Sequence, residues 1–128
     1  GVRLKAIADP FADFKDWPGA GGVTSKNPED VLKDPEIEAV LVCSSTPSHA
    51  DLTDAAASAG KHVFCEKPLA MTVAEARHSL KVCRKARVNL GTAFMMRYHS
   101  QHQAALRLNA WRRGTASPVC GGLGLTRC

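Results

Sequence analysis

The segment from Gly60 to Ala70 constrains the fold of this chain more than any other. It reads Gly-Lys-His-Val-Phe-Cys-Glu-Lys-Pro-Leu-Ala, so it joins a glycine that suits the end of a helix, a short apolar strand and a charged turn. Open α/β sheets bind ligands beyond the carboxyl ends of their strands, which is where the charged turn falls. The segment therefore indicates a parallel sheet with a functional edge.

Strand and helix patterns alternate along the chain. Apolar runs predict strands at residues 4–9, 39–43, 62–65 and 88–94. The continuous run 39–43 is typical of a strand that is buried on both faces. Capping residues predict helix starts at Asn27, Ser48 and Thr72, the last two as capping boxes, and apolar spacing predicts a helix over 100–111. This alternation is typical of an α/β fold with a doubly wound parallel sheet.

The periodic patterns stop at Gly114. Residues 115–128 contain three clustered glycines, a proline and no acidic residue, and they predict no helix or strand. We therefore expect a partial domain over residues 1–113 and an irregular tail over 114–128. A truncated or frame-shifted reading of a longer gene would explain such a tail.

Basic and acidic residues are separated along the chain. Up to Glu75 there are 7 Lys and Arg against 12 Asp and Glu, whereas the remainder holds 10 basic residues and no acidic one. Half of those basic residues fall on the helix predicted after Thr72, where a solvated face explains them and a polyanion partner is the alternative. The basic half lacks the interleaved aromatic residues of a single-strand binding surface, so nucleic acid is not an expected partner.

Five cysteines without CxxC spacing argue against a disulfide framework and a zinc site. We expect Cys43, Cys65 and Cys83 to be small buried or half-buried side chains. His99 and His102 have no carboxylate nearby in sequence, so we assign no metal. No apolar run approaches the roughly 20 residues of a membrane helix, and no secretion signal is visible, so we expect a cytoplasmic protein without a membrane partner.

Three segments together resemble the Gfo/Idh/MocA oxidoreductases. They are Gly-Lys-His-Val-Phe-Cys-Glu-Lys-Pro, the upstream Cys43-Ser44-Ser45-Thr46-Pro47-Ser48-His49-Ala50, and Phe94-Met95-Met96-Arg97-Tyr98, which is similar to the inositol dehydrogenase branch. The likeness covers roughly residues 2–113. It implies an NAD-dependent oxidoreductase that transfers hydride between nicotinamide and a small-molecule sugar or polyol such as inositol, and a parent enzyme that is a homo-oligomer.

The chain departs from the family pattern at its start. A glycine-rich turn should precede the acid that binds the cofactor ribose, yet Gly19–Gly22 follow Asp9. Order and spacing match the chain's first strand to the family's second. The resemblance therefore implies a partial Rossmann-type sheet that lacks its first strand and glycine-rich loop, the gap lying between the strands that end at Asp9 and Cys43.

The resemblance assigns cofactor contacts to five residues and catalysis to one. Asp9 would bind the ribose, and it favours NAD over NADP because a carboxylate repels a 2′-phosphate and no Arg or Lys follows within five residues. The other expected cofactor contacts are Ser44, Ser45, Thr46, Glu66 and Arg97. Lys67 would stabilise the alkoxide that develops during hydride transfer.

Each assignment has a structural alternative. Asp9 is also typical of a turn, and residues 44–46 are also typical of a strand-to-helix connection. Glu66 and Lys67 could form a surface ion pair, and Arg97 could be an ordinary solvent-exposed side chain. His49 matches a common family histidine and is expected to pack at a helix start rather than to catalyse.

The family's substrate domain, with its Asp and His base, has no counterpart in the chain, so the chain alone should be inactive. The rival interpretation is a non-catalytic binding or regulatory module with a degenerate nucleotide fold.

Overall fold

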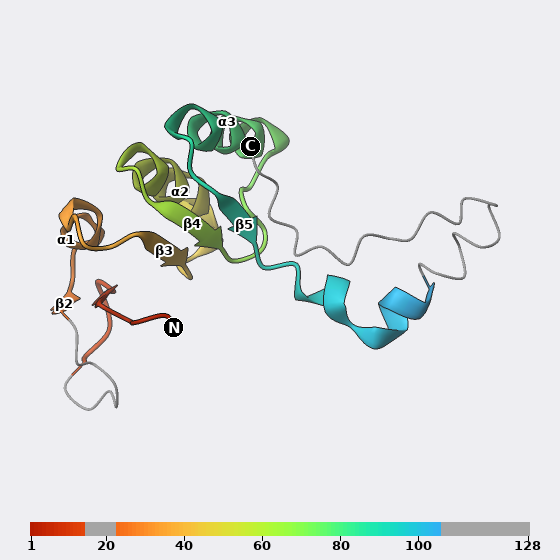
Figure 1. Cartoon of the computed structure of the whole chain (residues 1–128), viewed down its shortest axis with the longest axis horizontal. Helices are drawn as coiled ribbons and strands as arrows, with labels where there is room; N and C mark the ends of the chain where they lie inside the picture. The colour runs from red at the N-terminus through yellow and green to blue at the C-terminus, as the bar shows by residue number, and fades with distance from the viewer. Residues whose placement is uncertain (15–22, 106–128) are drawn as a thin grey trace.

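The computed structural model of the chain describes residues 1–14 and 23–105 (Figure 1). Its elements are β1 (Ala6–Ala8), β2 (Val23–Ser25), α1 (Pro28–Lys33), β3 (Ala39–Val42), the 3₁₀ turn η1 (Thr46–Ser48), α2 (His49–Ser58), β4 (His62–Cys65), α3 (Val73–Ala86), β5 (Leu90–Thr92) and the 3₁₀ turn η2 (Met95–Tyr98). Residues 100–105 are helical, as expected for the start of the helix 100–111. The predicted tail 114–128 and the glycines at 19–22 lie outside the described residues.

The strands form two separate parallel sheets. One contains β1 and β2, and the other has the order β3-β4-β5. In the larger sheet Val42 pairs with Cys65, and Cys65 pairs with Thr92, so the three strands end at the same edge. The expected Rossmann-type parallel sheet is confirmed. Among the described residues β1 and β3 belong to different sheets, and no strand pairs with both of them.

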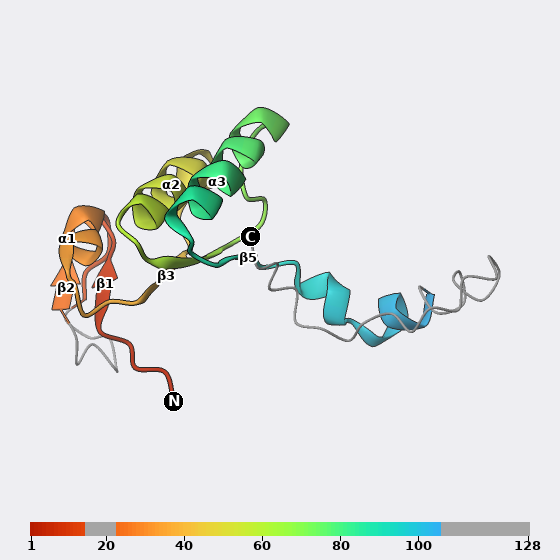
Figure 2. The same ribbon diagram turned by 45° about the horizontal axis from the view of Figure 1, so that its top comes forward.

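One face of the larger sheet is covered by α2 and α3, which lie side by side (Figures 1 and 2). The core beneath them consists of small and medium side chains: Val42, Ala56, Ala57, Val63, Cys65, Cys83, Val88 and Leu90. In β4 the pleat alternates, because Val63 and Cys65 point into this core while Phe64 points to the other face.

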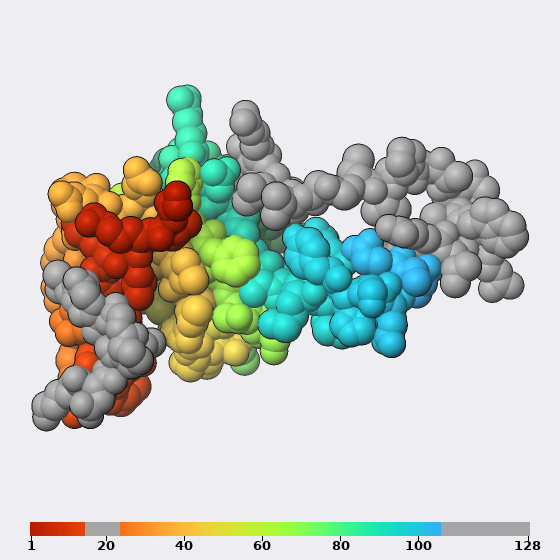
Figure 3. Space-filling view, turned by 60° about the horizontal axis from the view of Figure 1, so that its bottom comes forward, coloured from red at the N-terminus to blue at the C-terminus, as the bar shows by residue number. Residues whose placement is uncertain are grey.

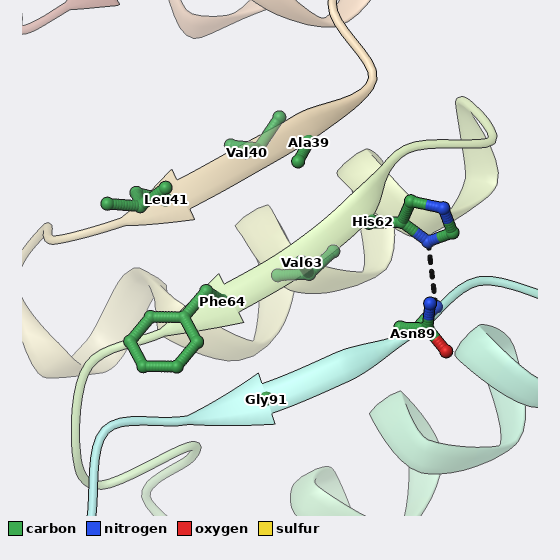
Figure 4. A pocket seen from close by; sticks show the side chains of 8 residues that line it. All are labelled: Ala39, Val40, Leu41, His62, Val63, Phe64, Asn89 and Gly91. Carbon is green, nitrogen blue, oxygen red and sulfur yellow. Dashed lines mark hydrogen bonds between the residues drawn. The ribbon is translucent and has the colours of Figure 1, made fainter. Parts of the chain in front are cut away.

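The other face of the larger sheet is open. Leu41 is 70% exposed and Phe64 is 48% exposed, and a shallow apolar hollow runs across this face (Figure 4). The hollow is lined by Ala39, Val40, Leu41, His62, Val63, Phe64, Asn89 and Gly91. The prediction that residues 39–43 are buried on both faces is therefore wrong, because no described element covers this second face. Cys43, expected to be at least half-buried, is exposed for the same reason.

The two predicted capping boxes have different outcomes. Before α3, the Thr72 hydroxyl accepts from the Glu75 amide at 3.2 Å, and the Glu75 carboxylate accepts from the Thr72 amide at 3.0 Å. Before α2, Ser48 makes no cap bond to the helix and instead donates to the Ser45 carbonyl oxygen at 2.8 Å. The capping box at Ser48 is wrong because η1 leads directly into α2 and turns this hydroxyl back toward the preceding loop.

A buried lysine fixes the connection that enters the larger sheet. Lys61 is 4% exposed, and its ammonium donates to the carbonyl oxygens of Asp34 at 2.7 Å and Ile37 at 2.9 Å. The Asp34 carboxylate pairs with Lys5 at 3.0 Å, beside the strand β1. The Glu36 amide first, and then the Lys5 ammonium, lower the pKa of Asp34 below its ordinary value. Polar contacts thus connect residues 34–37 to both sheets.

Replacement of Lys61 by methionine should destabilise the fold by about 2 kcal/mol, because two carbonyl oxygens lose a charged donor in a site that excludes water. Urea denaturation at low protein concentration measures the change in the free energy of unfolding. The matched control is Lys81→Met, at an exposed position on α3, which should change this free energy by less than about 0.5 kcal/mol. Equal effects of the two variants would contradict the role given to Lys61.

The open face and the outer edge of β3 should make this chain self-associate, because unpaired strand edges recruit other strands. Replacing Leu41 by lysine places a charge on this strand and should shift the chain toward monomer in sedimentation velocity. The matched control is Val73→Lys, at an exposed position. Leu52→Lys would not serve, because the Leu52 side chain packs on the core. A monodisperse, cooperatively melting wild-type monomer would show the expectation to be wrong.

Candidate functional site

The carboxyl ends of β3, β4 and β5 carry three polar loops. The Glu66 amide donates to the Val42 carbonyl oxygen and the Ala93 amide to the Cys65 carbonyl oxygen, both at 2.9 Å, so the ladder continues to the ends of the strands. The loops that follow are residues 43–48, 66–72 and 93–98. Because the strands are parallel and in register, these loops emerge at one edge of the sheet.

Glu66, Lys67 and Pro68 follow β4 directly, as predicted. The Glu66 carboxylate is half-buried and accepts from the Lys67 amide at 3.1 Å, and the Lys67-Pro68 peptide bond is cis. Lys67 is exposed, and no carboxylate in the described part of the chain lies within ion-pair distance of its ammonium. The alternative of a Glu66–Lys67 surface ion pair is therefore not what the structure shows.

Ser44, Ser45 and Thr46 form the loop after β3, beside the Glu66 turn. The Ser48 hydroxyl donates to the Ser45 carbonyl oxygen at 2.8 Å, and its oxygen lies 2.9 Å from the Ser44 hydroxyl oxygen. Ser44 and Ser45 are exposed and Thr46 is half-buried. This loop is both the strand-to-helix connection of the alternative interpretation and a row of hydroxyl groups at the sheet edge.

Asp9 ends β1 in the smaller sheet. Its Oδ1 accepts from the amides of Phe11 at 2.8 Å and Ala12 at 3.1 Å, and its own amide donates to the Ser25 carbonyl oxygen. The turn role expected as an alternative is thus real. The two amides of the turn bond to Oδ1, whereas Oδ2 has no hydrogen bond within the described ranges. One carboxylate oxygen therefore stays available for a ligand hydroxyl.

Arg97 lies in η2, on the segment 93–105 that extends away from the larger sheet (Figure 3). Its side chain is exposed, and no described hydrogen bond or ion pair joins it to the loops after β3 and β4. Nearby, the rings of His99 and His102 meet edge to face with centroids 5.4 Å apart. The structure does not bring Arg97 together with the other predicted site residues.

His49 is a site residue whose position the sequence did not reveal. It is 2% exposed, and its Nδ1 lies 2.7 Å from the Pro68 carbonyl oxygen while its Nε2 lies 2.9 Å from the Ser44 carbonyl oxygen. The ring therefore contacts both loops of the site. The sequence signals were its match to a common family histidine and its place at a helix start, and both also fit simple packing.

Cys65 lies under the site with its side chain in the core. Burial raises the pKa of the Cys65 thiol, which donates weakly to the Glu66 carbonyl oxygen at 3.3 Å. This thiol is therefore a packing group and not a nucleophile. Within the described residues, no group of three or more His, Cys, Asp or Glu side chains suits a metal ion, and no helix is long and apolar enough to cross a membrane.

Comparison with known proteins agrees with this geometry. The model of an oxidoreductase family with an NAD-binding Rossmann fold, GFO_IDH_MocA, matches residues 4–94. The chain is 47% identical over 73 residues to myo-inositol 2-dehydrogenase of Thermotoga maritima, a match that covers 57% of this chain and 22% of that protein. The chain thus spans about a fifth to a third of the length of the relatives it matches.

Two solved structures share the fold. Scyllo-inositol dehydrogenase from Lactobacillus casei with bound NAD(H) and scyllo-inositol superposes with a TM-score of 0.76 at 24% identity, over 86% of this chain and 34% of that one. A 3-ketoreductase from Actinomadura kijaniata in complex with NADP and TDP-benzene superposes with a TM-score of 0.70 at 31% identity, over 84% of this chain and 34% of that one. The parallel sheet, the polar loops at its carboxyl edge and the family match together place this chain in the Gfo/Idh/MocA oxidoreductase family, as part of its NAD-binding Rossmann domain.

Proposed function

We propose that this chain is the nucleotide-binding part of an NAD-dependent dehydrogenase that acts on a hydroxyl group of a sugar or polyol such as inositol. The observation that carries the proposal is Lys67, whose ammonium is exposed and unpaired among the described residues at the edge where parallel sheets bind ligands. The named relatives that act on inositols support this substrate class.

The residues present fit parts of the dinucleotide. The free Oδ2 of Asp9 suits two ribose hydroxyls, because a carboxylate accepts hydrogen bonds from both. The hydroxyls of Ser44, Ser45 and Thr46, with the Glu66 carboxylate, suit the second ribose and the carboxamide of nicotinamide. Bound NAD would take up or supply the hydride. The described residues offer no glycine-rich turn for the pyrophosphate.

Lys67 would act on the substrate oxygen. Its ammonium donates a hydrogen bond to the hydroxyl that is oxidised, and it stabilises the negative charge that grows on that oxygen as the carbon loses hydride. The hydroxyl proton must leave to a base, and we assign none on this chain. Arg97 would contact the substrate only if the segment 93–105 folds back over the edge, so we give it a secondary role in binding.

In a full-length enzyme that carries these residues, Lys67→Ala should lower kcat by about 100-fold or more, because the developing alkoxide loses its charged donor. Lys67→Arg keeps the positive charge on a side chain of different shape, and it should retain more activity than Lys67→Ala. The measurement is NADH formation with a panel of inositols and sugars. Lys81→Ala removes a cation from α3 as the matched control, and an unchanged kcat in Lys67→Ala would remove the catalytic role.

Asp9→Asn keeps the Oδ1 acceptor for the Phe11 and Ala12 amides and removes only the charge. In the same full-length enzyme we expect wild type to bind NADH more tightly than NADPH, and the variant to narrow this preference by about tenfold, since the repulsion of a 2′-phosphate is lost. Fluorescence titrations with both nucleotides measure the ratio. Asp51→Asn, an exposed acid on α2, is the control; an unaltered ratio in Asp9→Asn would contradict the ribose assignment.

A further inference from the structure

The two central loops of the site diverge beyond the sheet ladder. The last backbone hydrogen bond between their strands runs from the Glu66 amide to the Val42 carbonyl oxygen. Past it, no backbone hydrogen bond among the described residues joins the loop 43–48 to the turn 67–72. Something other than the ladder must therefore set the distance between the Ser44 loop and Lys67.

The His49 ring lies between these two loops. It is almost fully buried, and both of its nitrogens reach backbone oxygens, Nδ1 that of Pro68 at 2.7 Å and Nε2 that of Ser44 at 2.9 Å. Both distances lie within the normal range for N–H···O bonds. One side chain on α2 thus contacts the loop after β3 and the turn after β4 at the same time.

The chemistry of the partners decides which atom can donate. A backbone carbonyl oxygen has lone pairs and no proton, so it only accepts. A neutral imidazole ring carries one N–H and can donate to one of the two oxygens, while its other nitrogen lies against the second carbonyl group. Whichever nitrogen carries the proton, the ring is packed between the two loops.

We propose that His49 is a positioning residue whose buried ring bridges the two loops and holds the Ser44 loop at a fixed distance from the Lys67-Pro68 turn. The meaning of this distance rests on the proposed function, in which the first loop contacts the cofactor and Lys67 contacts the substrate. The contacts themselves do not depend on that function. A histidine that served only to pack would need neither of them.

The wild-type chain provides a direct test without any variant. In ¹⁵N-labelled protein, ring N–H protons that are buried and hydrogen-bonded exchange slowly with water and give resolved signals, whereas exposed histidines such as His78 and His102 do not. We expect at least one slowly exchanging ring N–H signal assigned to His49. The absence of any such signal would contradict a buried ring that donates to one of the loops.

Variants test whether the ring holds the loops. His49→Phe keeps a ring and removes both ring nitrogens, so amide hydrogen exchange in residues 43–48 and 66–72 should rise about tenfold while that of residues 50–58 stays near wild type. His62→Phe is the matched control, since His62 lies on β4 but accepts from the Asn89 amide at the far end of the strand (Figure 4). It should leave both loops unchanged.

The remaining outcomes are also decisive. His49→Gln, which has amide donors, should restore protection in at least one loop; equal exchange in the Gln and Phe variants would contradict a role for donation. A uniform rise in amide exchange across α2 and the sheet in His49→Phe would show that His49 acts only by packing. If that variant does not fold, the ring N–H signals and the exchange of His49→Gln still test whether His49 positions the loops. None of these measurements needs bound nucleotide or turnover, so an inactive enzyme would reject the proposed function and leave this inference standing.

Discussion

The parallel register of β3, β4 and β5 is the constraint on which the site depends. Because Val42, Cys65 and Thr92 stand side by side, the polar residues that follow each strand emerge at one edge. The register in turn depends on the small side chains of α2, where Ala56 and Ala57 have no exposed surface and let the helix approach the sheet closely. A one-residue slip in β4 would turn Val63 and Cys65 out of the core and move Lys67 away from its neighbours.

Much of this arrangement could be predicted because it is local. The Thr72 capping box, the apolar spacing of α3 and the helix stop at Gly60, whose φ is +77°, are properties of a few adjacent residues. The alternation of patterns predicted four of the five described strands and missed the short strand β2. The strand β4 has the predicted bounds, whereas β1, β3 and β5 are shorter than predicted, because an apolar sequence continues past the end of the ladder.

What could not be predicted depends on contacts between distant residues. An apolar run shows that Leu41 could be buried, but only the neighbours of the sheet decide whether it is. The Ser48 sequence pattern fits a capping box, yet a preceding 3₁₀ turn gave its hydroxyl a nearer acceptor. His49 packs at the start of α2, as expected. Its contacts with two loops could not be predicted, because the two carbonyl oxygens come from residues 5 and 19 positions away.

The contacts of Asp34 with Lys5 and Lys61 have a consequence for the distance between Asp9 and Lys67. Asp9 belongs to one sheet and Lys67 to the other, and no described strand pairing joins the two sheets. In the described residues, charged groups around residues 34–37 connect them instead. The pair of Lys5 and Asp34 is partly exposed, so ionic strength weakens it, whereas the buried Lys61 contacts and a backbone ladder are far less affected. The distance between Asp9 and Lys67 is therefore maintained by side-chain contacts, one of which salt weakens, and not by strand pairing.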